Sequence, residues 1–287
     1  MKTSKVLPIA ALVVFSMAAG VVMWSIRKPM EPGGPFAKKP LRIAAYSSFT
    51  SSWGPGPSIV AEFEKKCACS VVLEDFGDSG LLVEKMKLQG QDGGPDVVIG
   101  FDRYLAREAE VALKWRDLTT ATSSIPFLTE ARAGFNSPSF VPFDWAPLAF
   151  IYRKGEIEPP KSLLDLLDPR FAGKIALEDP RTSTLGLQFL TWVTSALPEN
   201  DFADYFKKLK PSLHSISPSW STAYGLFKKG EAKLVLSYLT SPIYHLVEEK
   251  DSKYAAAVFE SGHAVQAEFA AVPAACASCE RAEEFIA

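Results

Sequence analysis

A unit of short apolar strand, loop and helix recurs along the chain, and this recurrence constrains the fold more than any other feature. The segment LRIAAYS at 41–47 leads through SFTSSWGPG into the helical pattern PSIVAEFEKK, and KIALEDP at 174–180 leads through RTST into LGLQFLTWVTSAL. The same order follows SVVLED, PDVVIG and AKLVLSY. Strands and helices that alternate in this way form parallel or mixed sheets. We therefore expect an α/β protein with mixed sheets flanked by helices.

Two groups of these units are separated by a stretch without them. TTATSSIPFLTEARAGFNSPS is polar and irregular, and an extended run, FVPFDWAPLAFIYRKG, follows it at 140–155. Pro142 and Pro147 hold the residues before them extended, which predicts a long strand that crosses between two lobes. A return crossing is predicted within 254–272. The expected domains are lobe 1 at 41–138 and 267–287, and lobe 2 at 139–266.

The N-terminal segment is expected to lie outside this fold. Lys2 and Lys5 precede an uncharged, mostly apolar run at 6–26, and small residues in its second half offer a cleavage site. This is the pattern of a signal peptide, which we expect at 1–28, so that the protein is exported to the periplasm. Because about 20 apolar residues can also span a bilayer, an uncleaved anchor in the inner membrane is the alternative. The Pro- and Gly-rich stretch 29–40 is predicted to be a linker.

The cysteines form two close pairs, Cys67-Ala-Cys69 and Cys276-Ala-Ser-Cys279. These spacings are not those of a usual zinc finger, and export favours disulfides. We expect local pairing, with one disulfide inside each short loop. A redox motif at 276–279 is the weaker interpretation, because no thioredoxin-like context surrounds it.

Rings and acids gather where a ligand site is expected. Ligands bind open α/β sheets in the crevice at the carboxyl ends of the strands. An aromatic face attracts a flat cation, and a carboxylate adds a counter-charge or accepts hydrogen bonds from an amino group. The expected ligand is therefore a small, flat organic cation. The candidate residues are the rings Tyr46, Trp53, Trp220, Tyr238 and Tyr244 and the polar residues Asp78, Ser79, Asp102, Asp144 and Ser183.

Each candidate also has a structural alternative. Any of the rings could pack in the core, and Asp144 could make a hinge hydrogen bond. Ser183 could cap the helix that follows it, rather than hold an anion together with the free N–H groups there. Tyr224 lies four residues after Trp220 on the same predicted helix and is assigned to packing, as is Leu246 in the next helix.

No catalytic set is visible in the sequence. His214, His245 and His263 lack the spacing of metal ligands, and neither a G-x-S-x-G elbow nor a phosphate-binding loop occurs. The net charge is −2, and no basic patch points to nucleic acid. We therefore expect a binding protein without catalytic residues, metal ligands or a nucleic-acid partner.

Several motifs together resemble the periplasmic thiamine-binding proteins of ABC importers. They are FTSSWGPGPSIV, FVPFDWAPLAFIY, EDPRTSTLGL and SWSTAYGLFKKGEAKLVLSYLTSPIYHLVEEKDSKYAAAVF, and the likeness covers nearly the whole chain after Leu41. The resemblance implies a two-lobed periplasmic solute-binding protein of type II, with two hinge crossings, that closes on its ligand. It also implies that the chain binds thiamine, and its phosphates, between the lobes and delivers it to the permease subunits of an ABC transporter. Thiamine would be the ligand, no cofactor is expected, and we expect a monomer.

The resemblance assigns roles to individual residues. The five candidate rings would line the thiamine site, and Ser183 would lie near the phosphate end of thiamine phosphates. Asp78 and Ser79 belong to a loop that would reach the ligand. Family members continue beyond the final ERAEEFIA with a segment that packs on lobe 1 and adds a ring to the site. We therefore expect the C-terminal part of lobe 1 to be missing, with a loss of stability and affinity.

Other functions remain alternatives at this point. A receptor of similar shape could bind a polyamine or ferric iron, although iron receptors use adjacent tyrosines and Tyr238 and Tyr244 are separated by five residues. An enzyme that degrades thiamine or acts on a pyrimidine would need an activated nucleophile, such as a cysteine. Cys67 and Cys69 follow a predicted helix rather than a strand, which disfavours that role.

Overall fold

The computed structural model describes residues 39–287 except 90–92, 129–130 and 132–133. The signal peptide or anchor predicted at 1–28 lies outside the described residues, as does nearly all of the linker predicted at 29–40. Among the described helices, none combines the length and the apolar character needed to cross a bilayer.

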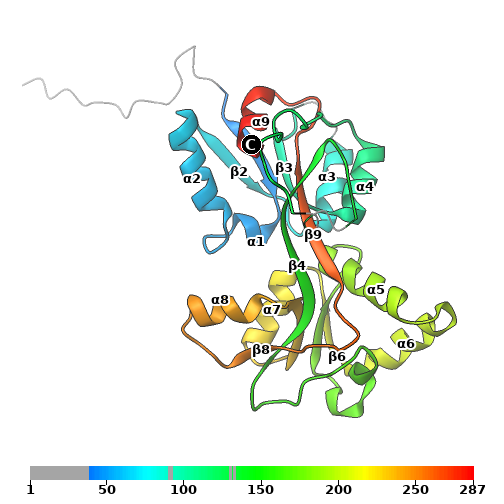
Figure 1. Cartoon of the computed structure of the whole chain (residues 1–287). Coiled ribbons are helices and arrows are strands. Elements are labelled where there is room, and N and C mark those ends of the chain that lie inside the picture. Colours follow the sequence, from blue (N-terminus) through cyan, green and yellow to red (C-terminus); the bar gives the residue numbers. More distant parts are fainter. Residues whose placement is uncertain (1–38, 90–92, 129–130, 132–133) are drawn as a thin grey trace, which may run out of the picture. The chain divides into compact units, whose positions relative to one another are not determined.

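The first lobe is built on three parallel strands and one antiparallel strand (Figure 1). In sheet order they are β2 (Val71–Asp75), β1 (Leu41–Ala45), β3 (Val97–Asp102) and β9 (Val265–Ala271). The helices of this lobe are α1 (Ser47–Thr50), α2 (Gly56–Cys67), α3 (Gly80–Gln89), α4 (Arg103–Ala112) and α9 (Cys279–Ile286).

The second lobe contains the other sheet. Strand β4 (Phe140–Arg153) pairs antiparallel with β7 (Leu234–Tyr238), and parallel pairing continues to β5 (Ile175–Glu178) and β6 (Leu213–Ser217). Strand β8 (Tyr254–Ala256) pairs with the other side of β4. The α-helices are α5 (Thr184–Ala196), α6 (Phe202–Leu209), α7 (Trp220–Lys228) and α8 (Ser241–Val247). Short 3-10 helices are η2 (Leu164–Leu167), η3 (Pro169–Phe171), η4 (Glu199–Asp201) and η5 (Lys210–Ser212).

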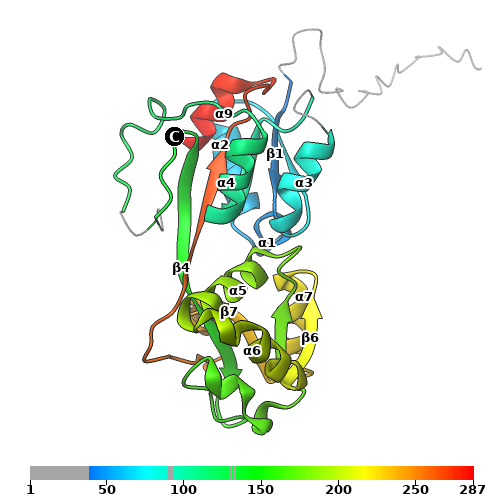
Figure 2. The same cartoon turned by 90° about the vertical axis from the view of Figure 1, so that its right-hand side faces the viewer.

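Strand β4 belongs to both sheets. Its residues Phe140–Pro147 pair with β9, and Leu148–Tyr152 pair with β7, so one continuous strand passes from one lobe to the other (Figure 2). The chain returns through the segment after β8 and enters the first sheet as β9. Both predicted crossings are therefore present, while the lobe boundaries predicted at 138/139 and 266/267 stay a prediction.

Separate apolar cores hold the two lobes. Phe63 packs in the first lobe, and Phe189 and Trp192 pack in the second. The prediction that Leu246 packs in the core is wrong, because 55% of this residue is exposed. Helix α8 buries the neighbouring His245 instead, and successive residues on a helix point about 100° apart.

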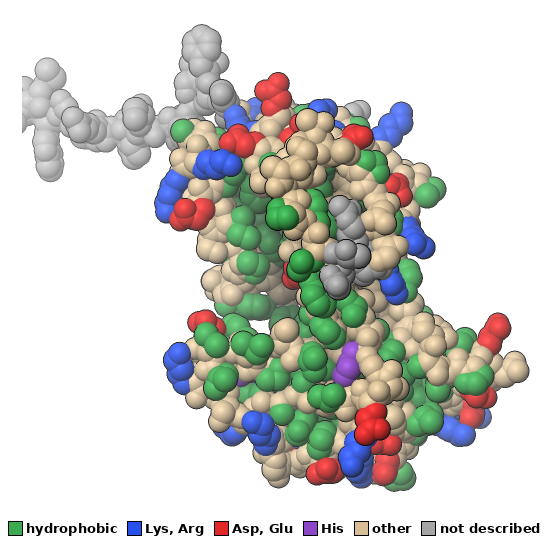
Figure 3. Space-filling view, viewed as in Figure 1, with side chains coloured by type: hydrophobic (Ala, Val, Ile, Leu, Met, Phe, Trp, Pro, Cys, Tyr) green, Lys and Arg blue, Asp and Glu red, His purple; other side chains and the backbone are tan. Residues whose placement is uncertain are grey.

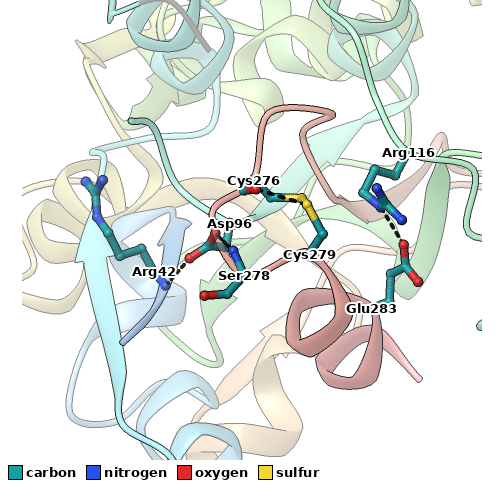
Figure 4. The surroundings of a disulfide bond; sticks show 7 residues. All are labelled: Arg42, Asp96, Arg116, Cys276, Ser278, Cys279 and Glu283. Carbon is teal, nitrogen blue, oxygen red and sulfur yellow. Dashed lines mark hydrogen bonds and ion pairs between the residues drawn. A yellow bond between two sulfur atoms is a disulfide. The ribbon is translucent and has the colours of Figure 1, made fainter. Parts of the chain in front are cut away.

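The structure joins Cys67 to Cys69 and Cys276 to Cys279, which is the local pairing expected from the sequence. Figure 4 shows how the second disulfide lies at the start of α9. Asp96 accepts hydrogen bonds from the backbone N–H of Arg42 at 3.0 Å and of Ser278 at 2.8 Å. Arg116 forms an ion pair with Glu283. The C-terminal helix is thus tied to the first sheet by polar contacts beside the disulfide.

Candidate functional site

A cavity of about 630 Å³ lies between the two lobes and is lined by residues of both. Figure 3 shows the molecule hollowed between its upper and lower halves, with hydrophobic side chains along the lower rim. All candidate residues from the sequence except Asp102 line this cavity: Tyr46, Trp53, Asp78, Ser79, Asp144, Ser183, Trp220, Tyr238 and Tyr244. The structure therefore brings together residues that are up to two hundred positions apart in the chain.

Tyr46 is positioned by a glycine in the neighbouring strand. Gly100 lies where the pairing of β3 with β9 shifts register, and its φ of 110° is a left-handed conformation that favours glycine. A Cβ atom on Gly100 would lie 2.1 Å from Cδ1 of the Tyr46 ring. The absent side chain at Gly100 thus leaves the space in which the Tyr46 ring packs against β3.

Trp220 lines the cavity and contacts rings of both lobes. It begins α7, and its Nε1 donates a hydrogen bond to Ser237 Oγ at 2.9 Å. Its ring lies 6.0 Å from that of Trp53, which belongs to the first lobe and is 53% exposed. It also lies 4.9 Å from the ring of Tyr224. Two lobes therefore contribute facing rings, with Trp53 at the open edge.

Tyr224 is buried, as its assignment to packing requires, and it also lines the cavity. Its hydroxyl is 2.7 Å from Nε2 of His245. Tyr238 ends strand β7, and Tyr244 follows in the first turn of α8 with 43% of its surface exposed. The aromatic wall thus combines rings fixed in the core with a ring that can adjust to a ligand.

Asp78 connects the lobes at the edge of the cavity. Its carboxylate accepts hydrogen bonds from the backbone N–H of Ser79 at 2.8 Å and of Trp220 at 3.0 Å. Burial raises the pKa of Asp78, and the hydrogen bonds oppose this shift. Ser79 is itself buried. Next to it, a Cβ atom on Gly80 would lie 2.3 Å from the carbonyl oxygen of Thr182, so the loops of the two lobes are in direct backbone contact.

Asp102 does not lie in the cavity, where the sequence interpretation placed it. Strand β3 passes directly into α4, and Asp102 is the N-cap, accepting from the N–H of Tyr104 at 2.9 Å and of Leu105 at 2.8 Å. Its second oxygen accepts from Gln188 Nε2 of the other lobe at 2.8 Å. Because no loop separates the strand from the helix, the free N–H groups of the helix take up this carboxylate.

Glu268 is a cavity residue that the sequence analysis missed. It lies in β9 directly opposite Asp144 of β4 in the antiparallel register. Its Oε1 accepts from Gln266 Nε2 at 2.9 Å, whereas its Oε2 is buried without a hydrogen-bond partner among the described residues. The available signal was one acid inside the apolar run AVQAEFAAV of a predicted crossing.

Burial and mutual repulsion change the titration of these acids. Desolvation, followed by the charge of Asp144, raises the pKa of Glu268 to about 8. Burial also raises the pKa of Asp144. The phenol pKa of Tyr238 is raised well above its usual value by burial and by Glu268, Asp144 and Asp78 around it. The cavity therefore brings several acids together, with Glu268 withdrawn from water and Asp144 exposed at the cavity surface.

Ser183 precedes α5 but makes no side-chain cap hydrogen bond, so the capping alternative is not realised. Its buried side chain lies beside Asp78. Among the described residues that line the cavity, Lys228 is the one lysine or arginine, and it is paired with Glu249 at 2.5 Å. Rings and acids in excess over cationic groups are chemically suited to a positively charged, aromatic ligand.

Two lobes joined by crossing segments, with a cavity between them, are typical of proteins that bind a small molecule between their lobes. Comparison with known proteins agrees with this class. The chain belongs to the bacterial extracellular solute-binding protein family, whose model matches residues 58–287.

Individual relatives are similar over most of the chain. The thiamine-binding periplasmic proteins of Salmonella typhimurium and Escherichia coli are each 38% identical over 252 residues, which is 88% of this chain and 76% of the relative. A solved structure of a periplasmic thiamin binding protein superposes on this chain with a TM-score of 0.82 at 38% sequence identity. The alignment covers 89% of this chain and 79% of the solved chain. The predicted two-lobed α/β fold is thereby confirmed. Like these relatives, this chain is a solute-binding protein.

Proposed function

We propose that the protein binds thiamine, and its phosphates, in the interlobe cavity and delivers it to the permease subunits of an ABC transporter. The observation that carries this proposal is the cavity lining, where rings from both lobes surround the acids Asp144 and Glu268. Thiamine joins a flat aminopyrimidine to a permanently cationic thiazolium, so it offers π-faces, donors and a positive charge to such a lining. The names of the similar proteins support the same ligand.

The residues that line the cavity would have different roles. Tyr46, Trp53, Trp220, Tyr238 and Tyr244 would contact the two rings of thiamine. Asp144 would supply counter-charge, while Asp78 and Ser79 would hold the loop that closes over the ligand. Ser183 would lie near the phosphate of a phosphorylated ligand, because its hydroxyl is not used for capping and α5 begins beside it.

Export to the periplasm, a monomeric state and the absence of catalytic turnover belong to the same proposal. The relatives named above are described as periplasmic. Residues 1–28 would act as a signal peptide, or 6–26 as a retained anchor. Intact mass of the protein isolated from the cell distinguishes the two, since cleavage removes the mass of the signal segment.

A fluorescence titration tests the ligand. Trp53 and Trp220 line the cavity, so thiamine is expected to quench tryptophan emission with saturation at nanomolar to micromolar concentration. Spermidine and ferric iron serve as competitors at equal concentration and should not displace thiamine. Displacement by either would replace thiamine with that cation as the ligand, and thiamine cleavage products in the mixture would indicate an enzyme. Failure of thiamine and its phosphates to bind would contradict the proposal.

A further inference from the structure

The cavity contains a pair of carboxyl groups that face each other across two strands. Asp144 and Glu268 are direct partners in the β4–β9 register, and at such positions the side chains share one face of the sheet with their Cβ atoms about 5 Å apart. Glu268 is 6% exposed, and its Oε2 has no hydrogen-bond partner among the described residues. Asp144 is exposed in the open cavity, whereas Glu268 is withdrawn from water. Like charges at such neighbouring positions disfavour each other's ionisation.

The groups around the pair do not neutralise it. On β9, Gln266 donates to Glu268, and at the end of β1 the phenol of Tyr46 is its polar neighbour. Tyr238 of β7 adds a second neutral phenol. Asp102 of β3 is the direct partner of Glu268 on its other side, but its carboxylate is held by the N–H groups at the start of α4 and by Gln188. The other charged or titratable groups nearby are the acids Asp78 and Glu178, Arg103 beside Asp102, Lys228 paired with Glu249, and His245 paired with Tyr224 and Glu249.

We propose that Glu268 and Asp144 hold one proton between them in the ligand-free cavity, and that the cation of the ligand displaces this proton to solvent when it binds. Glu268 thereby becomes a specificity-determining residue for cations, since a neutral ligand gains nothing from ionising the pair. The inference rests on the proposed function for the identity of the cation. The proton balance is simple: one positive charge enters the cavity and one H⁺ leaves.

The sign of the pH dependence follows from linkage. The pKa of Glu268 is raised to about 8 without ligand. A bound cation favours the ionised carboxylate and lowers this pKa, so binding releases a proton at pH values below about 8. Affinity should increase with pH, by up to roughly tenfold per pH unit, and level off above about pH 8.

Calorimetry of the full chain with thiamine chloride tests the proposal. Because the thiazolium charge is permanent, the ligand does not exchange a proton near neutral pH. Titrations at about pH 7 in two buffers of different ionisation enthalpy should give binding heats that differ in proportion to the release of about one proton. As the pH is raised toward about 8, the difference between the two heats should shrink, because less of the proton remains to be released.

Variants separate Glu268 from the remainder of the site. Glu268→Gln keeps the shape but holds no titrating proton, so proton release and the pH dependence of affinity should both disappear. Glu260→Gln is the matched control, since Glu260 is exposed and does not line the cavity. It should behave as the wild type. If Glu268→Gln does not fold, Asp144→Asn removes the partner charge, so proton release should shrink and its pH range should move to lower pH, while the effect of burial on Glu268 remains.

Different results overturn different claims. Thiamine binding with identical heats in both buffers and constant affinity would refute the shared proton and leave the proposed function intact. Failure of thiamine to bind at any pH would refute the proposed function. In that case carbon NMR of the ligand-free protein decides on the proton. A Glu268 carboxyl that titrates near pH 8 supports it, and one that titrates near its ordinary value of 4.5 overturns it.

Discussion

Two buried acids between the lobes differ in their hydrogen-bond partners, although burial raises the pKa of both. In the seam, Asp102 receives hydrogen bonds from two backbone N–H groups of α4 and from Gln188 of the other lobe. In the cavity, Glu268 accepts from Gln266, has the phenol of Tyr46 as a further donor, and lies opposite Asp144. The donors around Asp102 offset part of the cost of burying its charge, whereas Glu268 has fewer donors and depends on a proton or on the cation of a ligand.

The largest effect is expected from pH on the ligand-free protein. The pKa of Glu268 is raised from an ordinary value of 4.5 to about 8. Between these values the unfolded chain has released a proton that the folded protein keeps. The free energy of unfolding should therefore fall as pH rises, by up to about 1.4 kcal/mol per pH unit, and stop falling above about pH 8.

Urea unfolding at about pH 5, 7 and 9 measures this slope. The Glu268→Gln variant should lose much of it, and Glu260→Gln should retain it. Saturating thiamine should also flatten the slope, because the cation replaces the proton. If the free energy of unfolding depends on pH equally in the wild type and in Glu268→Gln, Glu268 does not keep an extra proton in the folded protein.

Loss of Asp102 should lower the stability of the protein at neutral pH, where its carboxylate accepts hydrogen bonds from both lobes. Asp102→Ala removes the cap of α4 and leaves Gln188 and two backbone N–H groups without their acceptor. A decrease in the free energy of unfolding of about 3 kcal/mol is expected from the lost cap and the unsatisfied donors. Denaturant unfolding measures it. A decrease below about 0.5 kcal/mol would contradict the structural role of Asp102.

Gly80 permits the two lobes to meet, and its substitution should affect binding more than folding. A Cβ atom there would lie 2.3 Å from the Thr182 carbonyl oxygen. Gly80→Ala should push the lobes apart and weaken thiamine binding by about 2 kcal/mol, or roughly thirtyfold. Fluorescence titration and thermal unfolding measure the two effects separately.

Gly93→Ala provides the opposite control. Gly93 has a φ of 75° in open surroundings, so its substitution should lower stability without weakening binding. Unchanged affinity in Gly80→Ala would mean that ligand binding does not depend on the contact between these loops.

The smallest effect on binding is expected far from both regions. Replacing Cys276 and Cys279 together by serine opens a short loop at the start of α9, which should lower the free energy of unfolding by about 2 kcal/mol. Asp96 still holds Ser278, so the helix should stay in place. Thiamine affinity should be unchanged within about twofold, and a larger loss would couple α9 to the cavity.

The strands whose ends line the cavity could be predicted from the sequence, because each is an apolar run followed by a loop and a helix. Tyr238 ends β7 and Trp220 begins α7, as expected from the sequence. Strand β6 was not identified. It is an edge strand that alternates, with Ile216 59% exposed, and it has no apolar run.

Hydrogen-bond partners were the part that the sequence could not supply. Asp102 and Glu268 are both single acids in apolar strands. Which one is saturated with donors depends on Gln188 and the start of α4 in one case, and on the opposing Asp144 in the other. The start of α4 directly follows Asp102, but Gln188 and Asp144 come from distant parts of the chain, so the folded arrangement is needed to separate a structural acid from a cavity acid.

A crystal structure with thiamine tests the central claim most directly. The expected result is thiamine in the interlobe cavity, with its rings against Trp220 and Tyr238, its thiazolium beside Asp144 and Glu268, and the Asp102–Gln188 hydrogen bond intact. Thiamine bound elsewhere, or bound in the cavity with its cation turned away from both carboxylates, would contradict the division between a structural seam and a cation-binding cavity.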